Sequence, residues 1–223
     1  MNTLQILYQD HGLVAIDKPA GLLVHQTQPP EPDDQIAMKI LRNQIGQTIY
    51  TIHRLDRPTS GVLLFALSKA SLRLAHDLFE KRRVTKKYLA VVYGKTPLTW
   101  QTDTPLRRTD SEEPRAALTD FKRISTCPSG SILNLPEHSI VEATPHTGRY
   151  HQIRRHLQQA GHPIIGDYLY GDIKTNTRTT EQLGHTRMML RATELHFNHP
   201  ETGAPTSIYA PPAPDFRVFN PTA

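Results

Sequence analysis

The sequence predicts an α+β fold built on a mixed, mostly antiparallel sheet. Many short apolar runs have the length of β-strands, and turn residues separate them. A few segments repeat apolar residues every three or four positions, as amphipathic helices do. Long polar connections join these elements, and many strands with few helices favour an α+β arrangement.

The predicted strands are short apolar segments bounded by turn residues. In chain order they are 4–8, 13–16, 22–25, 49–52, 62–67, 87–94, 118–124, 139–143, 188–197 and 205–210. The segments 95–116 and 171–186 are polar, and we expect both to be loops, the second of them mobile.

Two helices are expected in the first third of the chain. Asp34 is placed to cap the first, which runs to about Ile45. Ser68 is placed to cap the second. Their core-facing stripes consist of Ile36, Ile40 and Leu41 in the first helix and Leu72, Ala75, Leu78 and Phe79 in the second.

A third helix is expected between Thr147, as its cap, and Gly161, which can end it in the left-handed conformation. Its apolar side consists of Tyr150, Ile153, Leu157 and Ala160. Taken by itself, this segment is an ordinary basic amphipathic helix.

Composition limits the class of protein. The 223 residues suffice for one domain or two small ones, and 37% of them are hydrophobic. No apolar run approaches the roughly 18 residues that cross a membrane, and residues 1–5 do not resemble a signal peptide. The only cysteine is Cys127, which excludes an internal disulfide and a multi-cysteine zinc site and agrees with a cytoplasmic location.

Positive charge gathers in several clusters. The formal net charge is +5, and residues 81–87 hold five cations. Arginine pairs stand at 107–108 and 154–155. Each cluster alone could be a solvated helix end, where cations complement the helix dipole. Together they favour a surface that binds phosphates.

The segment 52–61 is the strongest candidate for a functional loop. It places Asp56 between Arg54 and Arg57, and apolar strands flank it on both sides. Catalytic side chains often sit on loops that a rigid scaffold holds. On these ten residues alone an ordinary turn is the favoured alternative, because Asp, Pro, Ser and Gly are turn residues.

Several motifs in a fixed order favour the interpretation of segment 52–61 as a functional loop. They are Asp17–His25, His53–Gly61, Lys86–Tyr88 and the region from Gly148 to Leu157 with its continuation at 161–167. In their order and spacing these motifs resemble the RluA-type pseudouridine synthase family, over about residues 4–200.

Details of the resemblance indicate which members of the family this chain is most like. The segment 42–47 and the Arg57-Pro58 pair resemble members that modify tRNA more than those that modify ribosomal RNA. Two positions depart from the family pattern. Tyr150 stands where many members carry a small or basic residue, and Arg191 replaces the usual histidine, which leaves the role of that position open.

The resemblance implies the conversion of uridine to pseudouridine within RNA, with no cofactor and no metal. Asp56 corresponds to the catalytic aspartate, which attacks covalently or takes a proton from the ribose. Arg154 corresponds to the arginine that pairs with it. Tyr88 corresponds to the tyrosine that lies against the uracil, and Leu190 would pack on the other side of the base.

A uridine in a stem must leave the helix before it can react. Arg54 corresponds to the family's arginine that enters the RNA where the base was. His53 beside it could contact the RNA backbone or pack within the protein, and packing is favoured.

The resemblance also implies the organisation and the partner. We expect a single catalytic domain over 1–223, without a separate N-terminal RNA-binding domain, and with a catalytic cleft across the sheet. The expected partner is tRNA, or another structured RNA, and the expected state is a monomer. The proposed uridine lies in the T stem of tRNA, near the acceptor junction.

Three alternatives stay open. One is a family member that acts on ribosomal RNA, and another is an RNA-binding protein without catalysis. The third is a metal-dependent hydrolase, suggested by the 12 histidines. However, His146, His151 and His156 are spaced by five and would not share a helix face as metal ligands do.

Overall fold

The computed structural model describes residues 3–26, 29–30, 32, 35–131, 135–185 and 187–219. The chain divides into two compact units. The first unit is Met1–Thr85 with Ala192–Ala210, and the second is Lys86–Arg191 with Pro211–Ala223. The expectation of one catalytic domain over 1–223 stays a prediction.

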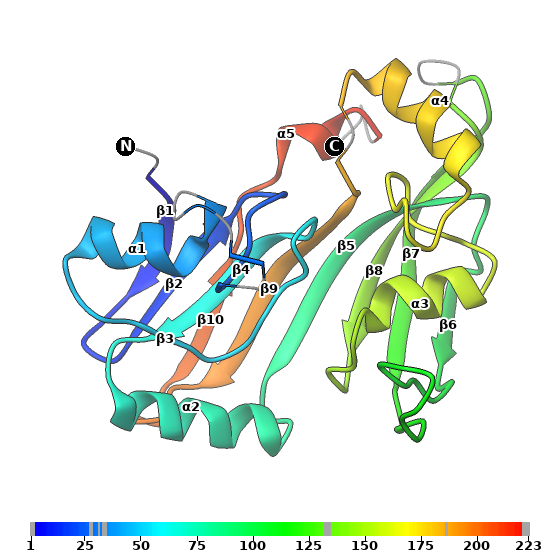
Figure 1. The fold of residues 1–223 in the computed structure, drawn as a ribbon. Coiled ribbons are helices and arrows are strands. Elements are labelled where there is room, and N and C mark those ends of the chain that lie inside the picture. The colour runs from blue at the N-terminus through cyan, green and yellow to red at the C-terminus, as the bar shows by residue number, and fades with distance from the viewer. Residues whose placement is uncertain are drawn as a thin grey trace. The chain divides into compact units, whose positions relative to one another are not determined.

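The first unit contains a sheet in the order β1-β2-β4-β9-β10, with the short β3 also paired to β4 (Figure 1). The β1–β2, β2–β4, β3–β4 and β9–β10 pairs are antiparallel. The strands are β1 (Gln5–Gln9), β2 (Leu13–Lys18), β3 (Tyr50–Thr51), β4 (Ser60–Ala66), β9 (Leu190–Asn198, which enters this unit at Ala192) and β10 (Pro205–Tyr209).

Two helices belong to the first unit, α1 (Ala37–Ile45) and α2 (Lys69–Glu80). The predicted apolar stripes are confirmed: those of α1 are buried, and those of α2 pack into a core that the sheet supplies. The Ser68 hydroxyl accepts a hydrogen bond from the Ser71 N–H at 3.0 Å, so the predicted cap is also confirmed. Asp34, the expected cap of α1, lies outside the described residues.

The second unit contains an antiparallel sheet in the order β5-β8-β7-β6 (Figure 1). Its strands are β5 (Thr85–Tyr93), β6 (Thr99–Thr102), β7 (Thr119–Cys127) and β8 (His138–Pro145). Its helices are α3 (Gln152–Gln159), α4 (Ile173–Leu183) and α5 (Pro214–Arg217). These strands and helices confirm the predicted α+β class, and the strand pairs described here are antiparallel, as predicted.

The third predicted helix begins later than expected. Thr147 does not cap it, because the Thr147 hydroxyl donates to Gln152 Oε1 at 2.6 Å and the chain turns through His151 at a φ of +53° before α3 starts. The predicted end is correct. Gly161 has a φ of +81°, and the His162 N–H returns to the Leu157 carbonyl at 2.9 Å.

The prediction of a mobile loop at 171–186 is wrong, because most of this segment is helix α4. Asp172 caps the helix by accepting from the Thr175 N–H at 2.7 Å. The buried face of α4 is polar, and it consists of Asn176, Thr179 and Thr180. Hydrogen bonds satisfy this face, so the helix lacks the apolar periodicity that a sequence pattern detects.

Three further predictions differ from the structure. The expected strand at 22–25 is reduced to a single bridge between Leu23 and Ile36. The expected loop at 95–116 contains β6, and α5 was not predicted. Among the described residues, no helix is long and apolar enough to cross a membrane.

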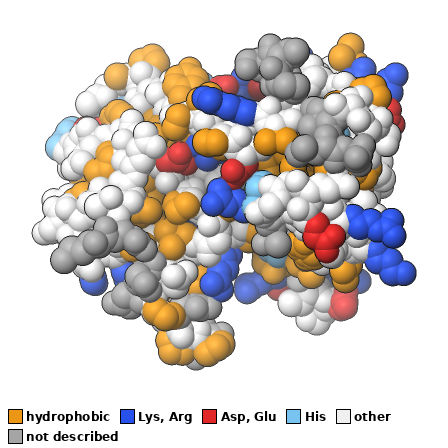
Figure 2. Space-filling view, turned by 90° about the horizontal axis from the view of Figure 1, so that it is seen from above, with side chains coloured by type: hydrophobic (Ala, Val, Ile, Leu, Met, Phe, Trp, Pro, Cys, Tyr) orange, Lys and Arg blue, Asp and Glu red, His pale blue; other side chains and the backbone are white. Residues whose placement is uncertain are grey.

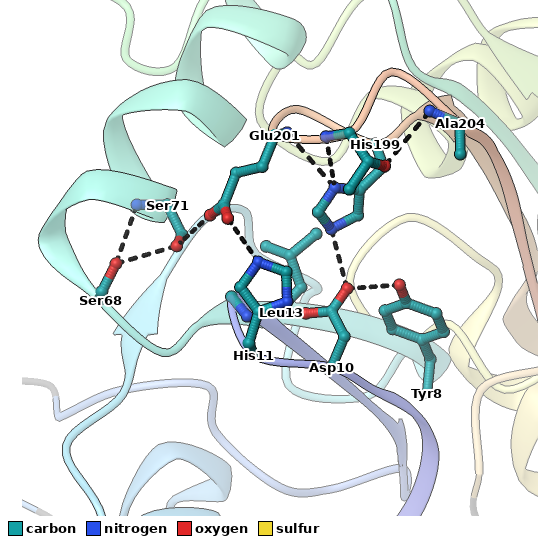
Figure 3. A network of polar contacts seen from close by, with 11 residues as sticks. Tyr8, Asp10, His11, Leu13, Ser68, Ser71, His199, Glu201 and Ala204 are labelled. Atoms are coloured by element: carbon teal, nitrogen blue, oxygen red, sulfur yellow. Dashed lines mark hydrogen bonds and ion pairs between the residues drawn. The ribbon is translucent and has the colours of Figure 1, made fainter.

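A polar network joins three segments of the first unit (Figure 3). At the β1–β2 turn, the Asp10 carboxylate accepts from the Tyr8 hydroxyl and lies 2.8 Å from His199 Nε2, on the β9–β10 turn. On the same turn, Glu201 accepts from the Ser71 hydroxyl of α2 at 2.6 Å and lies 2.7 Å from His11. The network therefore fixes the N-terminal end of α2 against both turns.

The charged form of Asp10 is the one that the network binds. Burial raises the pKa of this carboxyl, but the hydrogen bonds from Tyr8, Leu13 and Gly12 and the charge of His199 lower it below the ordinary value of 3.8. Folding therefore favours the carboxylate. Its contribution to stability is complete above that ordinary pKa and is lost as the pH falls through the lowered pKa.

We predict that Asp10→Asn lowers the free energy of unfolding at pH 7 by roughly 1–3 kcal/mol, because the network loses its anion. The difference from the unmodified protein should shrink at pH 3, because this is below the ordinary pKa of 3.8 and the unfolded chain takes up the proton there. Urea unfolding at both pH values measures this. Asp110→Asn, at a carboxylate whose side chain is fully exposed, is the control and should change little. An Asp10→Asn effect that is equal at both pH values would contradict the proposed role of the charge.

Candidate active site

The loop that carries Asp56 is a tight turn fixed to the loop after β2. The Thr59 N–H donates to the Asp56 carbonyl at 3.0 Å, which closes the turn. Arg57 and Gly21 bond in both directions: the Gly21 N–H donates to the Arg57 carbonyl, and Arg57 Nε donates to the Gly21 carbonyl, each at 2.9 Å. The Asp56 side chain is half-buried. The turn thus holds the carboxylate on a scaffold made by two of the predicted motifs.

Gly61 is the second residue of β4 and lies directly against β9. Its φ is +107°, and a Cβ at this position would come within 2.0 Å of the Ala192 carbonyl oxygen. Only glycine permits this approach of β4 to β9. Strand β4 includes Ser60 and Gly61, so the loop is shorter than predicted.

Lys18 lies buried beneath the loop, which the sequence alone did not indicate. Its ammonium group donates to three backbone carbonyls, those of Pro19 (3.0 Å), Leu22 (2.7 Å) and Arg57 (3.0 Å). Three acceptors match the three N–H donors of an ammonium ion. Burial lowers the pKa of Lys18 to about 7, although the charge of Asp56 acts to raise it. Lys18 thus joins the two loops and places a cation near the carboxylate.

The two other predicted residues of this loop differ in exposure. Arg54 is exposed, as a residue that meets RNA must be. Burial and the charge of Arg54 together lower the pKa of His25, which places Arg54 near the loop after β2. His53 accepts a hydrogen bond from the Leu64 N–H at 3.1 Å and stacks on Phe79 with 4.9 Å between ring centres. These contacts support the packing alternative for His53, and its contact with RNA stays a prediction.

Arg154 lies in the second unit, in a buried ion pair with Asp167. Arg154 Nε and Nη2 donate to the two carboxylate oxygens at 2.7 Å and 2.8 Å. The Asp167 side chain is 1% exposed and also accepts from the backbone N–H groups of Leu169 and Tyr170. Asp167 ends one of the family motifs, but its sequence context alone did not indicate this role. The expected pairing of Arg154 with Asp56 joins residues of different units and stays a prediction.

Tyr88 and Leu190 belong to one core cluster of the second unit. Leu190 opens β9 and is buried, and the half-buried Tyr88 of β5 packs against the same cluster. Ile153 of α3 is also a member, so the elements that carry Tyr88, Arg154 and Leu190 share one core. Arg191 is buried next to Leu190 and donates to the Pro211 carbonyl at 2.8 Å, and this contact accommodates its guanidinium.

The histidines have separate partners. His146 bonds Asp120, His151 bonds Tyr170, and His156 bonds Thr119. Over the described ranges, no group of three or more His, Cys, Asp and Glu side chains is placed to hold a metal ion.

Known proteins match this chain over most of its length. The family model of RNA pseudouridylate synthase matches residues 12–159. A protein named tRNA pseudouridine synthase C from Pasteurella multocida (strain Pm70) is 42% identical over 221 residues, covering 93% of this chain and 91% of the relative. A protein of the same name from Haemophilus ducreyi (strain 35000HP / ATCC 700724) is 43% identical over 211 residues, covering 89% and 87%.

Solved structures match as well. Human RNA Pseudouridylate Synthase Domain Containing 1 superposes with a TM-score of 0.77 at 26% identity, over 94% of this chain and 84% of that one. Human RNA Pseudouridylate Synthase Domain Containing 4 superposes with a TM-score of 0.75 at 26% identity, over 96% and 90%.

We predict that Asp167→Asn lowers the free energy of unfolding by about 3–5 kcal/mol, because it leaves the buried charge of Arg154 uncompensated. Asparagine keeps the size and one carbonyl acceptor, so the change reports mainly the charge. Urea unfolding measures it, with Asp110→Asn, at the exposed pair with Arg107, as the control. A loss below about 1 kcal/mol would show that other groups compensate Arg154.

We predict that Lys18→Met lowers the free energy of unfolding by about 2–4 kcal/mol, because three backbone carbonyls lose their donor in the interior. Amide hydrogen exchange should accelerate at Gly21 and Thr59, where the two loops are joined. Lys81→Met, at an exposed lysine paired with Asp77, is the control. Unchanged exchange at Gly21 would mean that Lys18 does not hold the loops together.

Proposed function

Because the chain belongs to the RNA pseudouridylate synthase family, we propose that it converts a uridine of tRNA to pseudouridine. The observation that carries the proposal is the similarity to proteins named tRNA pseudouridine synthase C over nearly the whole of both chains. The loop around Asp56 supports it, since it presents a carboxylate on a rigid turn in the part of the chain that the family model covers.

The reaction is an isomerisation within one nucleotide. The bond between N1 of uracil and C1′ of ribose breaks, the uracil turns, and its C5 bonds to the same C1′. The proton on C5 is lost and N1 gains one, so atoms and electrons balance without an oxidant. The proposed reaction therefore requires no cofactor and no metal.

Asp56 is proposed as the catalytic group. The carboxylate either attacks C1′ or takes a proton from the ribose, and both roles require its ionised form. The Lys18 ammonium supports that form, since the interaction with Asp56 acts to raise the Lys18 pKa and the two opposite charges favour each other. The hydrogen-bonded turn keeps the carboxylate in a fixed position.

The residues of the second unit are proposed to hold the base. The Tyr88 ring offers a face on which uracil can stack, and its hydroxyl can assist the movement of the C5 proton. Leu190 supplies an apolar contact on the other side of the base. Arg154 is proposed to face Asp56 as well.

The uridine is proposed to lie in the T stem of tRNA, near the acceptor junction, so it must be flipped out of the stem. Arg54 is exposed and can occupy the place of the base. Lys and Arg side chains stand in several groups on the face seen in Figure 2, and they can bind phosphates. We also propose that the protein acts as a monomer in the cytoplasm.

Two other functions are weighed against this one. An enzyme for ribosomal RNA would use the same site, and its substrate distinguishes it. A non-catalytic RNA-binding protein would account for the arginines, but it gives no reason for a carboxylate on a loop that a buried lysine fixes. Incubating the protein with tRNA and with ribosomal RNA, and mapping pseudouridine in each, separates the three.

We predict that Asp56→Asn abolishes pseudouridine formation in tRNA, by at least about 1,000-fold, because an amide neither attacks C1′ nor takes the proton. The Kd for tRNA should change less than about threefold, since the base-holding and phosphate-binding residues remain. Asp110→Asn is the matched control and should keep full activity. Activity that survives in Asp56→Asn would show that another residue is catalytic.

A further inference from the structure

Three aromatic rings lie together, and we call them the aromatic ledge: Tyr150 and His151 in the turn before α3, and Tyr170 in the turn before α4. The Tyr150 and His151 rings are stacked, with 3.7 Å between centres and 22° between planes. The His151 ring meets Tyr170 edge-on, and His151 Nδ1 lies 2.9 Å from the Tyr170 hydroxyl. The ledge belongs entirely to the second unit.

The ledge is rigid at its base and open at its end. The Arg154 guanidinium, fixed by the buried pair with Asp167, lies 5.0 Å from the centre of the Tyr170 ring. The Tyr150 side chain, by contrast, is 44% exposed. An exposed aromatic ring alone is common in proteins. Here the ring is stacked on His151, which a hydrogen bond joins to Tyr170, so it loses little freedom when a ligand covers it.

Arginines surround the exposed end of the ledge. The guanidinium carbon of Arg108 lies 6.0 Å from the centre of the Tyr150 ring. Arg155 Nη1 donates to the carbonyl of Arg107, and Arg149 Nε donates to the carbonyl of Ala116. A guanidinium carries five N–H donors, so one such bond positions the group and leaves donors for a phosphate.

We propose that the aromatic ledge stacks an unpaired base of the substrate RNA other than the uridine that reacts, while the surrounding arginines bind its phosphates. Exposed aromatic faces beside arginines are how proteins bind unstacked nucleotides, because every base has a face that can stack. An acidic peptide would satisfy the arginines but would give the stacked rings no partner. The inference rests on the proposed function for the identity of the RNA.

The ledge would add a contact with the RNA away from the reacting nucleotide. A base that stacks there contributes to affinity and to the choice of RNA, without touching the reacting atoms. Tyr150 is therefore a binding residue and not a catalytic one.

The test measures the Kd of tRNA transcripts for Tyr150 variants, together with KM and kcat for pseudouridine formation. We expect Tyr150→Ala to raise the Kd about tenfold, the loss of one stacked base, and to raise KM more than it lowers kcat. Tyr150→Phe keeps the ring and should restore binding. Tyr209→Ala is the matched control, at an exposed tyrosine that also contacts a histidine, and should bind normally.

Thermal unfolding of each variant shows whether it is folded. If Tyr150→Ala is destabilised, Tyr150→Leu takes its place, because it keeps an apolar side chain over His151 and removes the face that stacks. Normal tRNA binding by the folded variant would overturn the proposal, and so would a Tyr150→Phe variant as weak as Tyr150→Ala. A poly-glutamate peptide that needs Tyr150 more than tRNA does would also overturn it.

The two proposals can fail separately. If the unmodified protein forms no pseudouridine but its tRNA binding still depends on the Tyr150 ring, the ledge is supported and the proposed reaction is wrong. If pseudouridine forms and Tyr150→Ala behaves as the unmodified protein, the reaction is supported and the ledge is wrong.

Discussion

A buried ammonium ion organises the loops of the first unit. Lys18 places its charge among the carbonyls of two loops. One of them carries Asp56, and its Arg57 lies 39 residues from Lys18 in the chain. Burial of a lysine is costly unless its donors are satisfied, and here each donor has a carbonyl. The carboxylate that we propose as catalytic therefore stands on a turn whose position is set by the interior of the protein.

The second unit also contains buried charges, and an ion pair compensates them. Arg154 and Asp167 are both buried, and each supplies the charge that the other requires. The cost of removing both charges from water offsets much of their attraction. The pair therefore serves mainly to fix the positions of the two side chains, and adds little net stability. It holds one guanidinium under Tyr170 and thereby under the aromatic ledge. The same pair thus supports both the proposed base-holding residues and the proposed second RNA contact.

Where sequence reasoning failed, polar groups were buried. Helix α4 has a polar inner face of Asn176, Thr179 and Thr180, so its segment looks like a loop. Thr147 has the hydroxyl of a typical helix cap, but this hydroxyl donates a hydrogen bond to the Gln152 side chain instead. In both cases hydrogen bonds to distant or neighbouring side chains outweigh local preference, and such partners are not visible in a short window of sequence.

The sequence by itself determined the α+β class, the strands with few exceptions, and the family through ordered motifs around Asp56, Tyr88 and Arg154. These features are local, since strand patterns and motifs lie in continuous stretches. Only the tertiary structure decided that Lys18 holds the Asp56 loop and that Asp167 pairs with Arg154. Those contacts join residues from separate segments, and burial fixes them because an unpaired charge in the interior is too costly to leave.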